Sequence, residues 1–344
     1  ILSASFPAAS GFTSALLNGG ELVNKGIELH GNVKVIDGAF KWDVDVNWST
    51  NTTDVVSLTP VGASEEDALE SIKLNGWLAL GVYAENGEKF GIIKGTRQLM
   101  DPETGAKLIN PLSGMPLTEA NQVLGNVQAD WFGSIKNNFS FKSFTFSALI
   151  DAKIGGDMFS ATEARKQQFG TGVSSLEGRD GYLLSNRILG ESNNERMGTG
   201  LYGNEYNSAI DDQGYLVEGD IAVRDENGAW VSSGEANDIY LNPQQYISDM
   251  SWKQHDLNVY DASFIKLREL SFGYNIPKSI LKKTNFFETA RLSIVGRNLA
   301  ILYQNTPKGI DPEAATNSTN RGLGIEFGSL LPSRNYGFNI NFSF

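Results

Sequence analysis

The sequence predicts an all-β fold, an antiparallel transmembrane β-barrel with long loops. Two stretches, 336–344 and 40–48, alternate strictly between apolar and polar or small residues. Because side chains along a strand alternate between its faces, each stretch has one apolar and one polar face. In a barrel the apolar face meets lipid and the polar face lines the lumen. No apolar run approaches the ~18 residues of a membrane-spanning helix, which leaves strands as the predicted spanning elements.

The last strand of the chain ends on an aromatic residue. Its apolar positions include Tyr336, Phe338, Phe342 and Phe344. A strand of a soluble sandwich can show the same alternation, but chain ends tend to be polar and frayed. An aromatic end closed against a neighbour is typical of the terminal strand of an outer-membrane barrel. These four residues are therefore predicted to form the assembly signal for the barrel assembly machinery.

The composition excludes several classes of protein. The 344 residues include 37 Gly and 19 Phe, which favours β structure with many turns. There is no cysteine, so disulfides and thiolate metal sites are excluded. The net charge is −12 and no basic cluster is visible, so no nucleic-acid partner is expected. The first residues do not form a signal peptide, and we expect that the chain lacks its natural N-terminus.

Strands are expected along the chain in pairs. Residues 24–35 and 40–50 predict a hairpin with a tight turn at Asp37-Gly38. Trp42 and Trp48 lie near the two ends of the second strand, where interfacial aromatic residues belong. Further strands are predicted at 77–84, 89–94, 130–140, 142–151, 262–274 and 289–299, for roughly eight to ten wall strands in all. Loops are predicted at 1–23, 51–75, 99–125 and 303–333.

Residues 154–260 form the longest predicted connection. The stretch is rich in Gly, Asn, Ser and acidic residues, and it lacks clean alternation. Long connections of outer-membrane barrels lie on the extracellular face, so recognition is expected here. The candidate substrate-binding residues are the aromatic ones, which can stack on sugar rings or peptide side chains: Trp230, Tyr240, Tyr246 and Trp252. The alternative is that these rings pack the loop against itself.

No enzyme, metal site or cofactor is predicted. His30 and His255 are far apart and have no metal-ligand spacing. Hydrolase, metalloprotease and phosphate-loop motifs are missing from the sequence. Residues 225–228, Asp-Glu-Asn-Gly, resemble the start of a calcium-binding loop, but the glutamate at the twelfth position is missing. A β-turn is the favoured interpretation.

Several segments resemble, in order, the SusC/RagA family of TonB-dependent outer-membrane transporters of Bacteroidetes. Residues 261–277, Asp-Ala-Ser-Phe-Ile-Lys-Leu-Arg-Glu-Leu-Ser-Phe-Gly-Tyr-Asn-Ile-Pro, are similar to the family's "ASFlKLReisLsYnlP" segment. Residues 292–299 followed by 309–313 are similar to "vyvsgrNLf…GyDPE". Residues 24–29 resemble "NkGvEl", and residues 154–157 resemble "GgD".

The resemblance implies that residues 1–344 are the C-terminal half of a 22-stranded, plugged barrel in the outer membrane. It implies active import of an oligosaccharide or peptide. A SusD-like surface lipoprotein would cap the barrel, and TonB, ExbB and ExbD would supply energy through an N-terminal part. A half-barrel leaves open edges in lipid, so the remaining wall and the plug are expected in the working protein.

Within such a barrel, four charged residues are expected to face the lumen. Asp43 and Asp45 lie two residues apart on the polar face of one strand. Arg291 and Arg297 lie opposite the apolar side of another. These groups are either solvated wall charges or a lining that tunes passage, and the arginines pair with plug carboxylates or within the wall.

Two other functions stay open at this stage. One is a passive, structural or export barrel without TonB coupling. The other is a soluble β-rich lectin or hydrolase, which only the aromatic residues of the long connection suggest.

Overall fold

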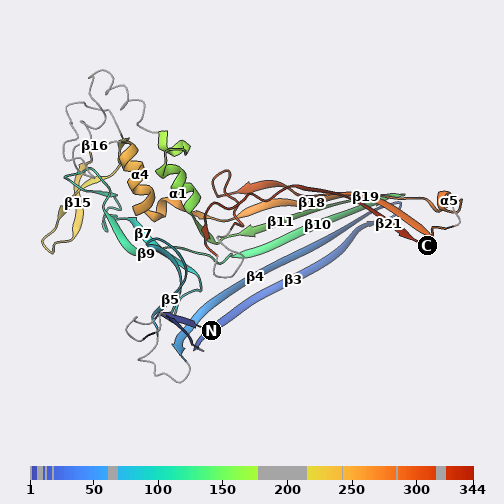
Figure 1. Ribbon diagram of the computed structural model, residues 1–344, viewed down its shortest axis with the longest axis horizontal. Coiled ribbons are helices and arrows are strands. Elements are labelled where there is room, and N and C mark those ends of the chain that lie inside the picture. Colours follow the sequence, from blue (N-terminus) through green and yellow to red (C-terminus); the bar gives the residue numbers. More distant parts are fainter. Residues whose placement is uncertain are drawn as a thin grey trace, which may run out of the picture.

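The chain folds into a long two-faced sheet with a smaller assembly of sheets and helices at one end (Figure 1). The computed structural model describes residues 2–5, 11, 14–17, 19–60, 69–176, 215–241, 243–283, 286–314 and 323–344. We call the large sheet the wall sheet. We call the assembly at its end, built from residues 69–126, 157–261 and 323–330 as far as described, the cap.

The wall sheet has seven strands, and every neighbouring pair is antiparallel. Its order is β21-β19-β18-β11-β10-β4-β3. The strands span β3 (Gly19–Asp37), β4 (Phe40–Pro60), β10 (Trp131–Phe141), β11 (Phe144–Ile154), β18 (Phe264–Asn275), β19 (Thr289–Gln304) and β21 (Asn335–Ser343). Strands β3 and β21 are the two edges of this sheet in the part of the chain that is described.

The register places apolar residues opposite apolar residues. Phe338 lies opposite Ile294, and Val33 lies opposite Val44. This apolar face stays uncovered: Phe338, Ile294 and Val33 are 61%, 59% and 58% exposed. An uncovered apolar face of this extent marks a surface that meets lipid or protein.

Aromatic rings line the apolar face near the short turns. Phe40 and Phe146 each stack on Phe139, with ring centroids 6.1 and 6.0 Å apart, and Phe144 stacks on Phe272 at 5.8 Å. The connections β3–β4, β10–β11 and β18–β19 all lie at this end, and the last holds the short helix α5 (Lys278–Leu281). The long connections all lie at the other end, where they build the cap (Figure 1).

In the part of the chain that the structure describes, the cap consists of four small sheets and two helices. The sheet β5-β6-β7-β9 contains Ser71–Trp77, Leu80–Glu85, Ile92–Gln98 and Thr118–Asn126. The other sheets are β15-β14-β8 (Trp230–Ala236, Asp220–Arg224, Leu108–Ile109), β17-β12-β20 (Val259–Asp261, Asp157–Ser160, Ile325–Glu326) and β13-β16 (Tyr215–Leu216, Tyr240–Leu241). The helices are α1 (Ala161–Gln168) and α4 (Pro243–Lys253), with short 3-10 turns η3 (Val173–Leu176) and η4 (His255–Asn258). A further hairpin pairs β1 (Leu2–Ser5) with β2 (Ser14–Leu17).

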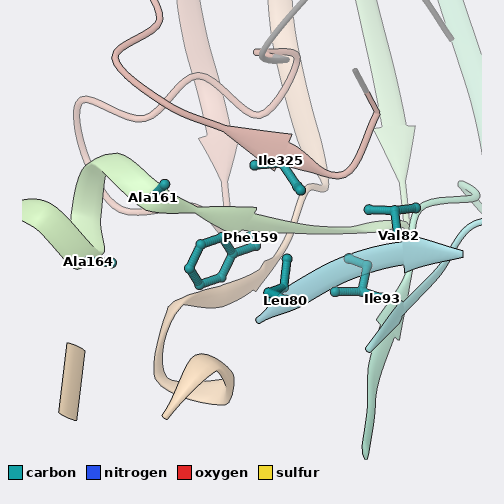
Figure 2. Packing of buried hydrophobic residues seen from close by; sticks show 7 residues of the cluster. All are labelled: Leu80, Val82, Ile93, Phe159, Ala161, Ala164 and Ile325. Atoms are coloured by element: carbon teal, nitrogen blue, oxygen red, sulfur yellow. The ribbon is translucent and has the colours of Figure 1, made fainter. Parts of the chain in front are cut away.

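The cap has its own hydrophobic core, drawn from segments far apart in the sequence. Phe159 packs in a cluster with Leu80 of β6, Ile93 of β7 and Ile325 of β20 (Figure 2). Helix α1 begins beside this cluster, where Ser160 Oγ accepts a hydrogen bond from the Glu163 N–H. Strand pairing and apolar burial together therefore fold the long connections into one body.

Several predicted strands are confirmed. The hairpins β3–β4 and β10–β11 turn where the sequence predicts, and β6–β7 forms the pair predicted around residues 85–88. The alternation of β11 slips at Leu149, and the pairing with β18 shifts register between Leu149 and Ile150. The extra residue of this β-bulge is Arg268 of β18, and the sequence did not predict it.

Other boundaries were wrong. The predicted loops at 1–23 and 51–75 are strand over 19–23 and 51–60, because β3 and β4 pair with each other far beyond the alternating segment. The predicted connection at 99–125 contains β8 and β9. Residues 154–260 contain α1 and α4 as well as strands, and the wall has seven strands where roughly eight to ten were expected. Strands that are rich in polar residues lack clear apolar–polar alternation, so the sequence pattern did not reveal them.

No helix in the described ranges is long and apolar enough to cross a membrane.

Candidate functional site

The polar face of the wall sheet carries a hydrogen-bonded row of side chains. Asp45 accepts hydrogen bonds from the Nδ2 atoms of Asn32 at 2.5 Å and of Asn138 at 2.9 Å, so strands β3, β4 and β10 are linked side by side. The next residue on this face of β4 is Asn47. Its Oδ1 atom lies 2.7 Å from His30 Nδ1, and its Nδ2 atom donates a hydrogen bond to Ser134 at 3.2 Å. These bonds fix the polar side chains along the face that the strand alternation sets apart.

The two wall arginines lie on the same polar face. Arg291 Nη2 donates to Thr145 Oγ1 at 2.9 Å, and Arg297 Nε donates to Glu269 Oε2 at 2.8 Å. Arg297 stays largely exposed, so this ion pair contributes little to stability. Both contacts join residues of the wall itself, as one of the two sequence-based alternatives expected. Asp43 lies on this face opposite Lys34 and Asn138.

A bulge at Arg268 redirects a guanidinium towards the junction of wall and cap. The pairing of β18 shifts register beside Arg268 against both β11 and β19. Arg268 Nε donates to both carboxylate oxygens of Asp151 at 2.7 Å, and Nη2 donates to Glu313. Bulges commonly re-aim a side chain near a functional site, and this one links two strands and a loop.

Lys266 is the buried member of the same cluster. Its Nζ atom lies 2.8 Å from Asp311 Oδ1 and 2.5 Å from Glu313 Oε2, with the Lys266 side chain 1% and the Asp311 side chain 5% exposed. Burial by itself would raise the pKa of Glu313, but hydrogen bonds from Arg268 and Lys266 outweigh it and lower that pKa. Residues 264–268 and 309–313 both belong to segments that carry the family resemblance. Ion pairs connect these two stretches in the structure.

Two glycines form the corner where β11 passes into the cap. Gly155 and Gly156 have φ of +77° and +81°, and an added Cβ would meet Asp130 Oδ2 at 2.4 Å or Val127 O at 2.8 Å. Both positions require glycine. Gly155 N–H donates to Ser263 Oγ, and Gly156 O accepts from Ala262 N–H at 2.7 Å.

Two carboxylates beside this corner have opposite environments. Burial raises the pKa of Asp157, although the Asn126 N–H donates to it. For Asp261, hydrogen bonds from Ser263 and Asn305 outweigh the effect of burial and lower the pKa. The Asp261 carboxylate is therefore ionised, and the hydrogen bonds that it accepts from Ser263 hold the residues just before β18.

A cavity of about 770 Å³ lies between the polar face of the wall sheet and this junction. Its charged and polar lining comes from wall strands and from the 309–313 segment: Glu28, His30, Asn47, Asp151, Lys153 and Glu313. Its apolar lining includes Met158 and Phe264. The volume lies within the range of small-molecule sites, and the mixed lining suits a polar organic ligand.

The predicted loop aromatics do not line this cavity. The Arg165 guanidinium lies over the Trp252 ring, 3.8 Å from the ring centroid. Trp252 also stacks on Trp77, with ring centroids 6.5 Å apart. Trp230 lies under Arg224 at 3.8 Å, and Tyr246 stacks on Tyr215 at 4.5 Å. The backbone of Tyr240 belongs to β16, but its side chain lies outside the described part. Partner contacts within the cap therefore occupy at least one face of each described ring.

The terminal strand pairs fully with β19. Phe342 stacks on Phe287 at 4.8 Å and Phe344 stacks on Phe286 at 5.6 Å, which anchors the aromatic end of the chain. Tyr336 and Phe338 remain exposed on the apolar face.

The remaining candidates fit ordinary structural roles. Residues 225–228 form the turn between β14 and β15: Gly228 N–H donates to Asp225 O, and Asp225 Oδ1 accepts from Asn227 and Ala229. The predicted β-turn is confirmed. Among the described residues, no group of three His, Cys, Asp or Glu side chains is placed to hold a metal.

Sequence reasoning missed the roles of Lys266, Arg268, Asp311 and Glu313. All four fall inside the segments that carried the family resemblance. The charge pattern does not show that these residues meet, because Lys266 and Arg268 lie over forty residues before Asp311 and Glu313. The bulge also determines where the Arg268 side chain points.

The sequences of known proteins match this chain along almost its whole length. TonB-dependent receptor P3 of Formosa agariphila is 25% identical over 98% of the chain and 30% of the relative. TonB-dependent receptor P39 of the same organism is 26% identical over 94% of the chain and 30% of the relative. The resemblance to SusC/RagA-like TonB-dependent transporters is confirmed. The chain spans about 30% of the length of the curated relatives that it matches.

Solved structures of the same type share the fold. The RagAB peptide transporter matches with a TM-score of 0.56 and 17% identity, over 99% of this chain and 31% of that one. The RagAB peptide importer in its "closed-closed" state matches with a TM-score of 0.59 and 16% identity, over 98% and 31%. No family model matches the chain. These relatives are named as receptors and transporters, not enzymes.

The buried ion pairs at the junction generate a stability prediction. Replacing Lys266 with Met leaves the buried Asp311 carboxylate without its ammonium partner, and removal of one member of a buried pair costs about 3–5 kcal/mol. We expect faster amide hydrogen exchange over residues 304–313. Lys41→Met, which removes an exposed pair with Asp37, is the control and is expected to cost at most about 1 kcal/mol. Equal exchange in the two variants contradicts the assignment.

Buried His255 predicts a dependence of cap stability on pH. Its Nδ1 accepts from the Thr96 N–H at 3.0 Å, and burial lowers its pKa below the usual 6.5. The unfolded state therefore binds a proton that the folded state does not, and stability falls as pH drops from 6.5 towards the folded pKa.

Hydrogen exchange of β7 amides between pH 7.5 and 5 measures this effect, with rates corrected for intrinsic pH dependence. His255→Asn keeps an acceptor near Thr96 but does not titrate, so its cap stability is expected to change less with pH. His30→Asn is the matched control on the wall sheet. A pH response equal to wild type in His255→Asn contradicts the role of His255.

Proposed function

We propose that the chain forms part of the barrel wall and the extracellular cap of an outer-membrane, TonB-dependent importer. The observation that carries the proposal is the similarity to TonB-dependent receptors along 98% of the chain. The two-faced wall sheet supports it, because an apolar face that the chain leaves exposed is stable against lipid. The short turns would lie on the periplasmic side and the cap, including residues 154–260, on the extracellular side.

Closure of the wall requires further strands. Strands β3 and β21 expose unpaired backbone groups along their outer edges in the described structure, and unpaired edges are not stable in lipid. We propose that residues 1–344 supply roughly half of a barrel of about 22 strands, with a plug inside. Tyr336, Phe338, Phe342 and Phe344 would present the terminal strand to the barrel assembly machinery.

The substrate is proposed to be an oligopeptide or an oligosaccharide. The related RagAB structures are titled as a peptide transporter and importer. The cavity at the junction of wall and cap would form part of the path. Asp43, Asp45, Arg291 and Arg297 would line the lumen, and Trp230, Tyr240, Tyr246 and Trp252 would contribute at most secondary substrate contacts.

The partners follow from the same proposal. A SusD-like lipoprotein would cover the extracellular face of the cap, in line with the two-component name of the RagAB structures. TonB with ExbB and ExbD would couple import to the proton-motive force through a part of the protein that lies outside this chain. The mechanism would be conformational: the substrate is enclosed under the lipoprotein, the plug is displaced, and the substrate leaves into the periplasm.

The orientation of the wall can be tested with a neighbouring pair of residues. Val44 lies on the apolar face and Asp43 on the polar face of the same strand. Val44→Arg is expected to destabilise the protein in lipid by about 2–4 kcal/mol, whereas Asp43→Arg has little effect, because only the first places a charge against hydrocarbon. Urea titration of full-length protein folded in lipid vesicles measures both. Equal costs would show that the two faces meet the same medium.

Import is tested in cells that express the natural gene with its neighbouring lipoprotein gene. Uptake of a labelled oligopeptide mixture and an oligosaccharide mixture is compared between wild type, a tonB deletion and cells treated with a protonophore. We expect uptake of one class, lost in both of the latter. Uptake that persists without TonB supports a passive barrel and overturns the proposal. Release of the protein from membranes by carbonate alone overturns the barrel itself.

A further inference from the structure

A second cavity lies inside the cap, away from the wall sheet. It has a volume of about 630 Å³ and is enclosed by the end of β7, by β13, by α4 and by η4. In Figure 1, α4 and β16 lie at the end of the cap that is far from the short turns of the wall. This cavity is therefore distinct from the one at the junction, and the Tyr215–Tyr246 stack described above forms part of its lining.

Two acceptor atoms beside this cavity lack hydrogen-bond partners. Gln254 is 4% exposed, and its Oε1 atom is buried and unpartnered; the Oδ1 atom of Asp256 is in the same state. Both residues line the cavity. The second carboxylate oxygen of Asp256 makes only long contacts of 3.4 Å, with Gln98 N and Gln254 Nε2. A buried polar atom without a partner destabilises the folded state, so such atoms mark places where a partner is missing.

Local backbone structure explains why these acceptors are held here. Helix α4 ends at Lys253, and Gln254 has an extended backbone (φ −112°, ψ 96°) before the 3-10 turn η4. Gln254 makes no capping hydrogen bond with its side chain. His255, between the two acceptors, is anchored through Thr96 on the opposite side, which holds the turn against β7.

The charges around the cavity indicate which kind of hydrogen-bond donor a ligand would bring to these acceptors. Glu218 lines the cavity beside Asp256, and Arg97, which also lines it, is already paired with Glu119 at 2.7 Å. Burial raises the pKa of Asp256, and a bound cation would reverse this by stabilising the carboxylate. Charge-assisted hydrogen bonds to a carboxylate are about twice as strong as neutral ones, which favours an ammonium over a hydroxyl group.

The rest of the lining suits an aliphatic stem. Met100, Leu216 and Leu257 supply apolar surface, and the stacked rings of Tyr215 and Tyr246 form one side. The butyl chain of a lysine is long enough to cover such surface while its ammonium group reaches the acceptors. Lys107 lies at the same cavity and would attract a carboxylate or carbonyl of the same ligand.

We propose that this cavity binds a primary ammonium group on an aliphatic stem, such as a lysine side chain of a peptide, with Gln254, Asp256 and Glu218 as acceptors. The proposal concerns binding and does not require transport. It refines the proposed function by favouring peptides over neutral sugars at this position of the cap.

Isothermal titration calorimetry on the full-length protein in detergent tests the proposal. The probes are acetyl-Gly-Lys-Gly-amide, the same peptide with acetylated lysine, and maltotriose. We expect the lysine peptide to bind at least roughly tenfold more tightly than either other probe, because a charged hydrogen bond is worth about 1.5–3 kcal/mol. Asp256→Asn is expected to weaken binding about tenfold, and Glu218→Gln about threefold.

Asp249→Asn is the matched control, because Asp249 lies on α4, pairs with Lys253 and does not line the cavity. Its affinity for the lysine peptide is expected to be unchanged. Glu218 is exposed, so Glu218→Gln keeps the test valid if Asp256→Asn misfolds. Equal affinity for both peptides, no binding at millimolar concentration, or an equal loss in Asp249→Asn overturns the proposal and leaves a water-filled cavity. Failure of TonB-dependent uptake with intact lysine binding would overturn the transport proposal alone.

Discussion

The two faces of the wall sheet are the constraint on which the rest of the structure depends. Seven antiparallel strands satisfy each other's backbone groups, yet the apolar face has nothing from the described chain to cover it. Such a sheet is stable only where another medium or another body meets that face. The polar face is held by side-chain hydrogen bonds such as those of Asp45, so each face is matched to a different environment.

The wall also determines where the remaining chain must go. The short connections between wall strands lie at one end, so the long connections emerge at the other, and there they fold on each other around Phe159. The link between wall and cap is made by specific contacts: a glycine corner, a bulge that redirects Arg268, and the buried Lys266 held by two carboxylates. A ligand at the junction thus contacts wall and cap together.

The two cavities differ in chemistry, and this separates two roles. The one at the junction is lined by charged residues of both signs, and two of them, Asp151 and Glu313, are already engaged in ion pairs, which suits a passage or a transient contact. The lining of the one inside the cap includes Gln254 and Asp256, each with a buried acceptor atom that has no hydrogen-bond partner, which suits selection of a ligand. Selection in the cap before entry into the wall is consistent with an importer.

The sequence by itself determined the two faces of the wall. Period-2 alternation reports which face a side chain takes, as at Phe40–Trp48 and Tyr336–Phe344. It did not determine the polar extension of β3 and β4, which pair with each other beyond the alternating segment, or the fold of residues 154–260, where β12 and β14 pair with segments distant in the sequence. Only the tertiary structure joined Lys266 to Asp311 and placed Gln254 beside a cavity. Ion pairs and buried acceptors depend on three-dimensional proximity, which local residue patterns do not encode.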